Sequence, residues 1–427
     1  MVLSIKVDNL IDRLILNIMV LEIMLFRWLD IMGITSAFLL VLACMAFVKY
    51  NRLYGNVTGF LVVGLIILYN LAEYYAFKGS LSVLLPNMFR VSKAFAVIAY
   101  ISIVYIYNRD FIVHFVEDRF ILFNFFAVIN IPITVIQIFN GDFLVGLRKH
   151  EYLGFNPDYI SGFFGMYGTP CMGVYLCYMI VLNYAFWKNQ KVKRTWGYLA
   201  YNLVLFAYYV GLFLINDNKG AYFMVVLTIM LTYIAVSNRS VYFAGETSKF
   251  IYNFGYLIRS FVVAAVVTLI LNSFDGINSV FIHVIEMLEE SIKATTYKSY
   301  GGSQRISIIL QILRGERKFF GYGLGRLIIK NKKAFGYSNF GLADLGYFMM
   351  EGGIVYIGLW AVLMFTLFEK IFKNAFLVLF IIFFIFVYAF YTQIFVDTSS
   401  FCSLVFLIIA LEMLYSGERW NSIGDGY

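Results

Sequence analysis

The sequence predicts an all-α, polytopic membrane protein with about 11–12 transmembrane helices, counted as apolar stretches of about 20 residues, and one large extracytoplasmic loop containing amphipathic helices. Composition is the first observation behind this prediction. Of 427 residues 62% are hydrophobic and only 14% are charged, whereas soluble domains carry about a quarter charged residues. The second observation is a single long polar interruption at residues 275–344, because apolar runs of bilayer length both precede and follow it.

The expected spans share an uncharged or nearly uncharged apolar stretch. They are Ile31–Val48, Val57–Phe77, Met88–Tyr107, Phe120–Phe139, Tyr159–Trp187, Trp196–Ile215, Gly220–Val236, Tyr256–Phe274, Leu345–Phe368, Ala375–Phe395 and Ser399–Tyr415. Residues 10–26 contain Asp12, Arg13 and Glu22, so they form either a twelfth span, which we favour, or an amphipathic helix in the interface. The expected organisation is one integral membrane domain, with an N-terminal bundle at 1–274, the loop at 275–344, and C-terminal helices with a short cytoplasmic tail at 345–427.

Lysine and arginine counts in short loops predict the orientation. One face holds most of them, and it is therefore expected to be cytoplasmic: Lys49, Arg52, Arg109, Arg119, Lys188, Lys191, Lys193, Arg194, Arg239, Lys249, Arg259, Lys370, Lys373 and Arg419. The opposite short loops hold fewer, namely Lys78, Arg90, Lys93, Arg148, Lys149 and Lys219. The long loop belongs to this second face and is expected outside the cytoplasm.

Cations on the outer face have no topological role, so each is a candidate for another function. Arg90 and Lys93 are three residues apart on one helix face and either bind substrate or snorkel to headgroups. Arg148 is a candidate ligand or an ordinary loop residue, and Lys219 a candidate ligand or a partner for Asp217. Together with Arg305 they predict a positive outer cavity that suits a phosphate or pyrophosphate. Nucleic acid is not expected as a partner, because the basic residues are divided among many short loops.

The long loop has recognisable parts. A helix is expected from Ser303 to Leu313, ending at Gly315, on the basis of apolar spacing. The run Gly321-Tyr322-Gly323-Leu324-Gly325 predicts either a turn that approaches a ligand closely or a flexible turn without one. The chain re-enters the membrane from Asn339 through Asp344, and Glu351 follows two helical turns later on nearly the same face. Asp344 and Glu351 are candidate catalytic carboxylates; their alternatives are a helix N-terminal acid and a partner for a structural cation.

This series of motifs resembles the O-antigen polymerase/ligase superfamily of bacterial inner-membrane glycosyltransferases. The resemblance covers Lys219 to the C-terminus and consists of Asn218-Lys-Gly-Ala221, Arg305, Gly321-Tyr-Gly-Leu-Gly325, Asp344-Leu-Gly-Tyr347 and Glu351-Gly-Gly-Ile354. It implies a metal-independent enzyme without a cofactor that uses undecaprenyl-pyrophosphate-linked oligosaccharides among membrane lipids. It also implies that Lys219 and Arg305 contact the pyrophosphate, and that a chain-length regulator and a flippase work alongside the enzyme.

The re-entry segment lacks the histidine that ligases of this superfamily often carry, so the resemblance favours a polymerase of O-antigen repeat units over a ligase. The expected catalytic residues are Arg305, Lys219, Asp344 and Glu351, and the expected substrate-binding residues are Arg90, Lys93, Arg148, Tyr322, Gly323, Gly325 and Asn339. No metal site is expected, because the four cysteines lie in apolar runs. A transporter for lipid-linked sugars is the alternative of a different class.

Overall fold

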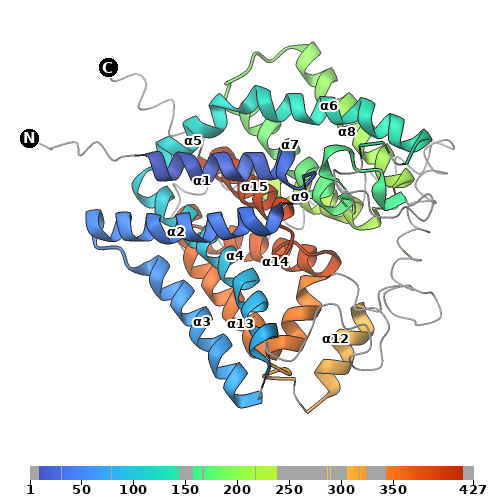
Figure 1. Cartoon of the computed structure of the whole chain (residues 1–427). Coiled ribbons are helices and arrows are strands. Elements are labelled where there is room, and N and C mark those ends of the chain that lie inside the picture. The colour runs from blue at the N-terminus through green and yellow to red at the C-terminus, as the bar shows by residue number, and fades with distance from the viewer. Residues whose placement is uncertain are drawn as a thin grey trace, which may run out of the picture.

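The computed structural model describes residues 9–29, 31–77, 79–141, 143–144, 157–165, 168–216, 218–237, 286, 289, 305–316, 318–323 and 343–416. Within these ranges the chain forms helices and no strand, which confirms the all-α prediction (Figure 1). The described chain contains nine helices that are long and apolar enough to cross a membrane, and the protein is therefore a multi-pass membrane protein.

The helices occur in the following order. They are α1 (Leu10–Leu21) with a π-helical turn at Glu22–Phe26, α2 (Met32–Tyr54), α3 (Thr58–Phe77), α4 (Leu81–Tyr107), α5 (Arg109–Asp118), α6 (Phe120–Phe139), α7 (Thr169–Lys188), α8 (Trp196–Ile215), α9 (Lys219–Ser237), α12 (Arg305–Arg314), α13 (Asp344–Phe372), α14 (Ala375–Tyr391) and α15 (Thr398–Ser416). Two short 3₁₀ turns, Pro157–Tyr159 and Gly162–Phe164, precede α7.

Within the described residues, most predicted spans coincide with observed helices. The fifth span begins at Thr169 instead of Tyr159, because the preceding residues fold into 3₁₀ turns and Pro170 stands in the first turn of α7. The amphipathic helix α5, Arg109–Asp118, was not predicted. The expected span at 256–274 lies outside the described residues, and α14 is apolar but shorter than the other spans.

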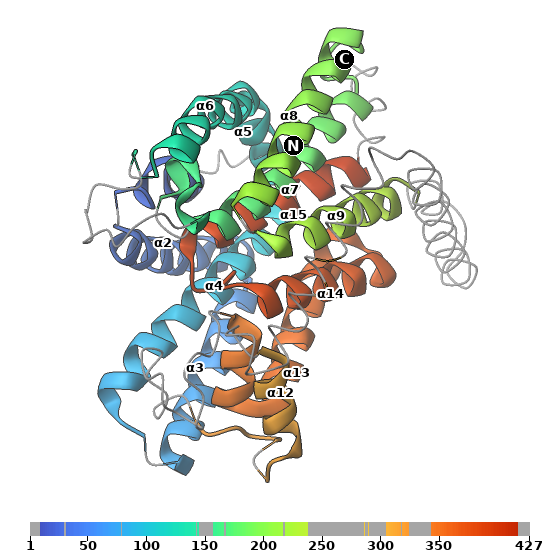
Figure 2. The same cartoon turned by 90° about the vertical axis from the view of Figure 1, so that its right-hand side faces the viewer.

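Three helices form the centre of the bundle. The apolar windows of α4, α7 and α15 are 89%, 83% and 94% buried within the protein, whereas that of α8 is 22% buried and is left for lipid. Helices α7 and α15 pack side by side, as both views show, and α4 packs against α2, α3 and α13 (Figure 2). Polar side chains on α4 and α15 are therefore enclosed by protein and must find partners there.

Residues 10–26 lie antiparallel to α2. Near one end Lys49 Nζ on α2 contacts Asp12 Oδ2 at 2.5 Å, and near the other end Thr35 Oγ1 donates to Glu22 Oε2 at 2.5 Å. Five apolar side chains of this segment are buried: Ile15, Leu16, Met19, Val20 and Ile23. The prediction that this segment forms a twelfth span stays a prediction.

Helix α13 is broken at Gly353, whose φ of 68° and ψ of −162° are not helical. A chain segment from the long loop satisfies the backbone groups that the break releases. Tyr322 and Gly323 N–H donate to the carbonyls of Met350 and Glu351 at 2.7 and 2.8 Å. In return, Ile354 and Val355 N–H donate to the carbonyls of Lys318 and Phe319 at 2.9 and 3.0 Å.

The glycines make this docking possible. Gly321 has a φ of 64°, and a Cβ at Gly321 would lie 2.6 Å from the Met350 carbonyl oxygen. A Cβ at Gly353 would lie 2.4 Å from the Phe319 carbonyl oxygen. Tyr69 on α3 completes the arrangement, because its hydroxyl donates to the Gly352 carbonyl at 3.0 Å. The predicted close approach of the Gly321–Gly323 backbone is thus an approach to α13.

We predict that Gly353→Ala destabilises the protein, because alanine disfavours this positive φ and its Cβ meets backbone that cannot move aside. The expected loss is at least about 1–3 kcal/mol of unfolding free energy, measured by thermal unfolding of the purified protein. Gly358→Ala on the same helix is the matched control, since nothing lies within 4 Å of a Cβ there. Equal unfolding temperatures for both variants would contradict the break.

Candidate functional site

A buried ion pair joins α4 to α13. Arg90 Nη2 lies 2.6 and 2.7 Å from the two carboxylate oxygens of Glu351, and the two side chains are 6% and 0% exposed. The guanidinium also lies 5.5 Å from the centre of the Tyr347 ring. Arg90 Nε and Nη1 have no hydrogen-bond partner among the described residues. Both oxygens of Glu351 are therefore occupied, while Arg90 keeps two nitrogens, Nε and Nη1, whose N–H groups another acceptor could use.

Asp344, the first residue of α13, is fixed by one carboxylate oxygen. Its Oδ2 accepts the Phe395 N–H at 2.6 Å and the Val396 N–H at 3.4 Å. The Asp344 N–H donates to the Thr392 carbonyl at 3.1 Å. Its Oδ1 is buried and has no partner in the described part of the chain. The second oxygen of Asp344 is therefore available as a hydrogen-bond acceptor, and Arg90 interacts with this carboxyl electrostatically.

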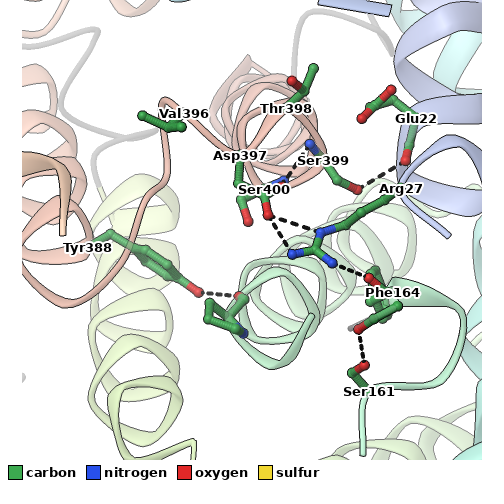
Figure 3. Close-up of polar contacts among 12 residues, drawn as sticks. Glu22, Arg27, Ser161, Phe164, Tyr388, Val396, Asp397, Thr398, Ser399 and Ser400 are labelled. Carbon is green, nitrogen blue, oxygen red and sulfur yellow. Dashed lines mark hydrogen bonds and ion pairs between the residues drawn. The ribbon is translucent and has the colours of Figure 1, made fainter. Parts of the chain in front are cut away.

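The loop between α14 and α15, residues 392–397, is also held by Arg27. Arg27 Nε and Nη2 donate to Asp397 Oδ2 at 2.9 and 2.7 Å, and Nη1 donates to the Phe164 carbonyl (Figure 3). Asp397 Oδ1 accepts the N–H groups of Ser399 and Ser400 at 3.1 and 3.0 Å, which caps the start of α15. The Arg27 guanidinium thus connects the N-terminal segment, the 3₁₀ turn before α7 and the start of α15.

Sequence reasoning missed the pair of Arg27 and Asp397. Asp397-Thr398-Ser399-Ser400 has the composition of a helix N-terminus, so a capping role for Asp397 could have been predicted from the sequence. Its partner was not, because 370 residues separate the two side chains. Next to this pair, Ser399 Oγ donates to the Glu22 carbonyl at 3.1 Å.

The turn before α9 lies at the same end of the bundle. Asn218 Nδ2 donates to the Thr169 carbonyl at 2.6 Å, at the start of α7. A Cβ on Gly220 would lie 3.4 Å from the Cβ of Tyr391, the residue before Thr392. The predicted pyrophosphate ligand Lys219 is the first residue of α9, and Arg305 is the first residue of α12, which packs against α13. The side chains of both residues lie outside the described part of the structure.

The predicted site residues are thus distributed as follows. Arg90, Asp344 and Glu351 are brought together, and Tyr322 and Gly323 reach them through their backbone contacts with α13. Lys93 contacts the 392–398 segment, with its Nζ 3.0 Å from Thr398 Oγ1. Arg148, Gly325 and Asn339 lie outside the described residues. The substrate-binding and catalytic roles assigned to these residues stay predictions.

We use the name outer polar cluster, after the orientation expected from the loop charges, for seven charged side chains at one end of the bundle. Its members are Glu22, Arg27, Arg90, Lys93, Asp344, Glu351 and Asp397. Three cations and four carboxyl groups are enclosed by four segments of chain, namely residues 22–27, α4, the start of α13 and the loop before α15. Within the described ranges, no group of three or more His, Cys, Asp or Glu side chains is placed to hold a metal ion.

Comparisons of the chain with profiles of known protein families, with curated proteins and with solved structures found no match.

We predict that Arg90 and Glu351 stabilise the protein as a pair. Arg90→Met or Glu351→Met alone should each reduce the unfolding free energy by about 3–5 kcal/mol, because each leaves a buried charge without its partner. The double variant should lose much less than the sum of the two. Unfolding of all four proteins in one detergent measures this coupling. Additive losses would mean that the pair does not form.

Asp397 lies outside the membrane-spanning segments, and its surroundings predict a dependence on pH. Burial raises the pKa of the Asp397 carboxyl, but the charge and hydrogen bonds of Arg27 outweigh this effect, and the pKa lies below its usual range. A lowered pKa in the folded protein provides stability that is complete above the unfolded pKa of about 3.9 and is lost as the pH falls through the folded pKa.

Arg27→Gln should therefore lower the unfolding temperature at neutral pH and weaken the additional loss of stability below about pH 4. Unfolding temperatures of the wild type and the variant, measured over this range in one buffer series, test the expectation. Arg13→Gln is a control, because Arg13 is exposed on the same N-terminal segment. If Arg27→Gln kept the acid profile of the wild type, the pairing of Arg27 with Asp397 would be wrong.

Proposed function

We propose that this protein is a polymerase of surface-polysaccharide repeat units in a bacterial inner membrane, of the O-antigen polymerase type. It would transfer a glycan chain from polyprenyl pyrophosphate to a hydroxyl of an incoming lipid-linked repeat unit. One observation carries the proposal: two motifs of the resemblance, at residues 321–323 and 344–353, pack against each other beside Arg90. They do so at the end of the bundle that the loop charges assign to the outer face.

The proposed reaction needs cations more than it needs a base. Its leaving group is a pyrophosphate ester, so the transition state gains negative charge on phosphate oxygens, and fixed donors stabilise that charge. Lys219 and Arg305 stand at the first positions of α9 and α12, where the helix N-termini add positive potential. Arg90 adds two nitrogens, Nε and Nη1, that have no hydrogen-bond partner among the described residues. This combination supports an anionic substrate at this end.

Asp344 is a better candidate than Glu351 for accepting the proton of the acceptor hydroxyl. Both oxygens of Glu351 accept hydrogen bonds from Arg90, so a hydroxyl would have to displace the guanidinium. Asp344 is held by Oδ2 alone, and Oδ1 can accept a further hydrogen bond. A general base must come within hydrogen-bond reach of the proton it takes, and of these two residues Asp344 has the carboxylate oxygen with this freedom.

A transporter for lipid-linked sugars is the second candidate, and the break of α13 at Gly353 is the observation that favours it. Interrupted helices bind substrates and ions in many transporters. In this chain, however, the released carbonyls of Met350 and Glu351 are already used by Tyr322 and Gly323. This occupancy supports a structural break over a transport site.

One experiment separates the candidates. Purified protein is incubated with lipid-linked repeat units, without nucleoside triphosphate, and products are resolved by chain length. The polymerase proposal expects dimers and longer chains, and it expects no transfer to a lipid A core acceptor, which a ligase would require. Movement of the same lipid across reconstituted vesicles without chain growth would instead identify a transporter and overturn the proposal.

We predict that Arg305→Ala and Lys219→Ala abolish long polymer while protein abundance in the membrane stays unchanged, because each removes a charge that would hold the pyrophosphate. Arg314→Ala is the matched control, since Arg314 is exposed at the other end of α12. Normal chain ladders from Arg305→Ala and Lys219→Ala would end the proposal.

Asp344→Asn should lower turnover by about 10²–10⁴-fold, the usual contribution of a general base, because an amide cannot take the proton. Asparagine keeps an oxygen that can accept the Phe395 N–H, so the local fold should be retained.

A further inference from the structure

Lys93 is buried in the outer polar cluster at a point where three oxygens surround its ammonium group. Its Nζ lies 3.0 Å from Thr398 Oγ1, 3.3 Å from the Val396 carbonyl oxygen and 3.4 Å from Ser36 Oγ. Lys93 is 2% exposed, so water does not replace these contacts. An ammonium group has three N–H donors and no acceptor, so each N–H group of Lys93 has one oxygen to which it can donate. We name these three oxygens the oxygen cage.

The carboxyl groups of the outer polar cluster also favour a cation in the cage. Arg27 pairs with Asp397 and Arg90 pairs with Glu351. The carboxyl groups that interact electrostatically with Lys93 are Glu22, Asp397 and Asp344. Among the described residues, neither Glu22 nor Asp344 accepts a hydrogen bond from an arginine. Without Lys93, this enclosed region would hold four carboxyl groups and two cations, an arrangement that a low-dielectric interior disfavours.

The oxygen cage has the composition of a monovalent cation site. Two hydroxyl oxygens and one backbone carbonyl from a non-helical segment, with carboxyl groups nearby, are ligands that sodium sites in membrane proteins also use. The oxygens come from α2, from the loop before α15 and from the first residue of α15, so a cation there joins three segments. Ser36 Oγ and Thr398 Oγ1 are also joined to each other by a hydrogen bond of 2.6 Å, which holds these two oxygens of the cage together.

The cage is linked to Asp344 through a single residue. Val396 accepts from Lys93 through its carbonyl and donates its N–H to Asp344 Oδ2 at 3.4 Å. The preceding N–H, of Phe395, donates to the same Asp344 oxygen at 2.6 Å. A cation that holds the Val396 carbonyl therefore also fixes the backbone that orients the Asp344 carboxylate.

We propose that the oxygen cage is a monovalent-cation site permanently filled by the ammonium group of Lys93, which makes Lys93 a positioning residue for Asp344. Lys93 then acts within the protein and does not contact substrate phosphate. The proposal of the cage does not depend on the proposed function. The effect of Lys93 on catalysis, through Asp344, does rest on the proposed function. A small free cation should enter the cage only when the lysine side chain is removed.

The test uses purified full-length Lys93→Ala and Lys93→Met, with thermal unfolding in ammonium, methylammonium or sodium chloride. Choline chloride keeps the ionic strength constant, and choline is too large for the cage. Lys93→Ala should unfold at a lower temperature than the wild type and recover with ammonium in a saturable manner. Lys93→Met fills the space with an apolar chain and should lose stability without recovering. The wild type should not distinguish the cations. Equal responses of both variants to ammonium would overturn the cage.

A second measurement covers the case in which Lys93→Ala does not fold. Thr398→Val removes one cage oxygen and should lower the unfolding temperature of the wild type, but have a much smaller effect in Lys93→Met, where no ammonium remains to bind. Additive effects of the two substitutions would overturn the proposal. Neither measurement needs substrate, so both hold even if the polymerase proposal fails.

If the protein polymerises lipid-linked repeat units, ammonium should also restore kcat in Lys93→Ala while KM stays at the wild-type value. An effect on kcat without an effect on KM is expected, because a positioning residue acts on the orientation of Asp344 and not on substrate affinity. Recovery of stability without recovery of kcat would overturn the positioning role. An elevated KM corrected by ammonium would mean that Lys93 contacts the substrate, which also contradicts the proposal.

Discussion

The break of α13 at Gly353 is the constraint on which the rest of the candidate site depends. A helix interrupted inside an apolar bundle exposes backbone carbonyls and N–H groups to surroundings that contain no water to bind them. Residues 318–323 supply the missing partners, and they do so through main-chain atoms, which requires glycine at positions 321 and 353. Glu351, which pairs with Arg90, lies two residues before the break, and Asp344 is the first residue of the same helix. The docked loop segment, the ion pair and the carboxylate therefore share the first turns of α13.

A second level of organisation comes from the loop before α15. Asp344 binds its N–H groups, Lys93 binds the Val396 carbonyl and Arg27 binds Asp397. These charged groups reach the loop from α13, α4 and the N-terminal segment respectively. Within this loop the Asp397 N–H donates to the Gln393 carbonyl at 3.2 Å, and the charged side chains bind further polar groups of the loop in place of solvent. The cost of burying them is reduced because cations and carboxylates are enclosed together.

Hydropathy was sufficient to predict most of the spans that the described residues contain, because bilayer thickness fixes the length of an apolar helix. Helix α12 ends before Gly315, as its apolar spacing predicted. The sequence could not predict which motifs meet. The glycine run and the Glu351-Gly-Gly segment were each interpreted separately, and only the fold reveals that they bind each other. Arg27 was not singled out at all, since its partner Asp397 lies at the other end of the chain. Long-range pairing of this kind depends on tertiary packing and leaves no local periodicity.

The cations that already pair with groups inside the protein also limit where a pyrophosphate could bind. Arg27 and Lys93 are committed to the loop before α15, and one nitrogen of Arg90 is committed to Glu351. Under the proposed function the substrate charge would then fall mainly to Lys219 and Arg305, at the helix N-termini that begin α9 and α12. The start of α9 lies beside Tyr391 at Gly220, and the backbone N–H of Asp344 donates to the carbonyl of the next residue, Thr392. Under the proposed function, a diphosphate held at the start of α9 would therefore lie beside the chain segment to which the backbone of Asp344 is attached.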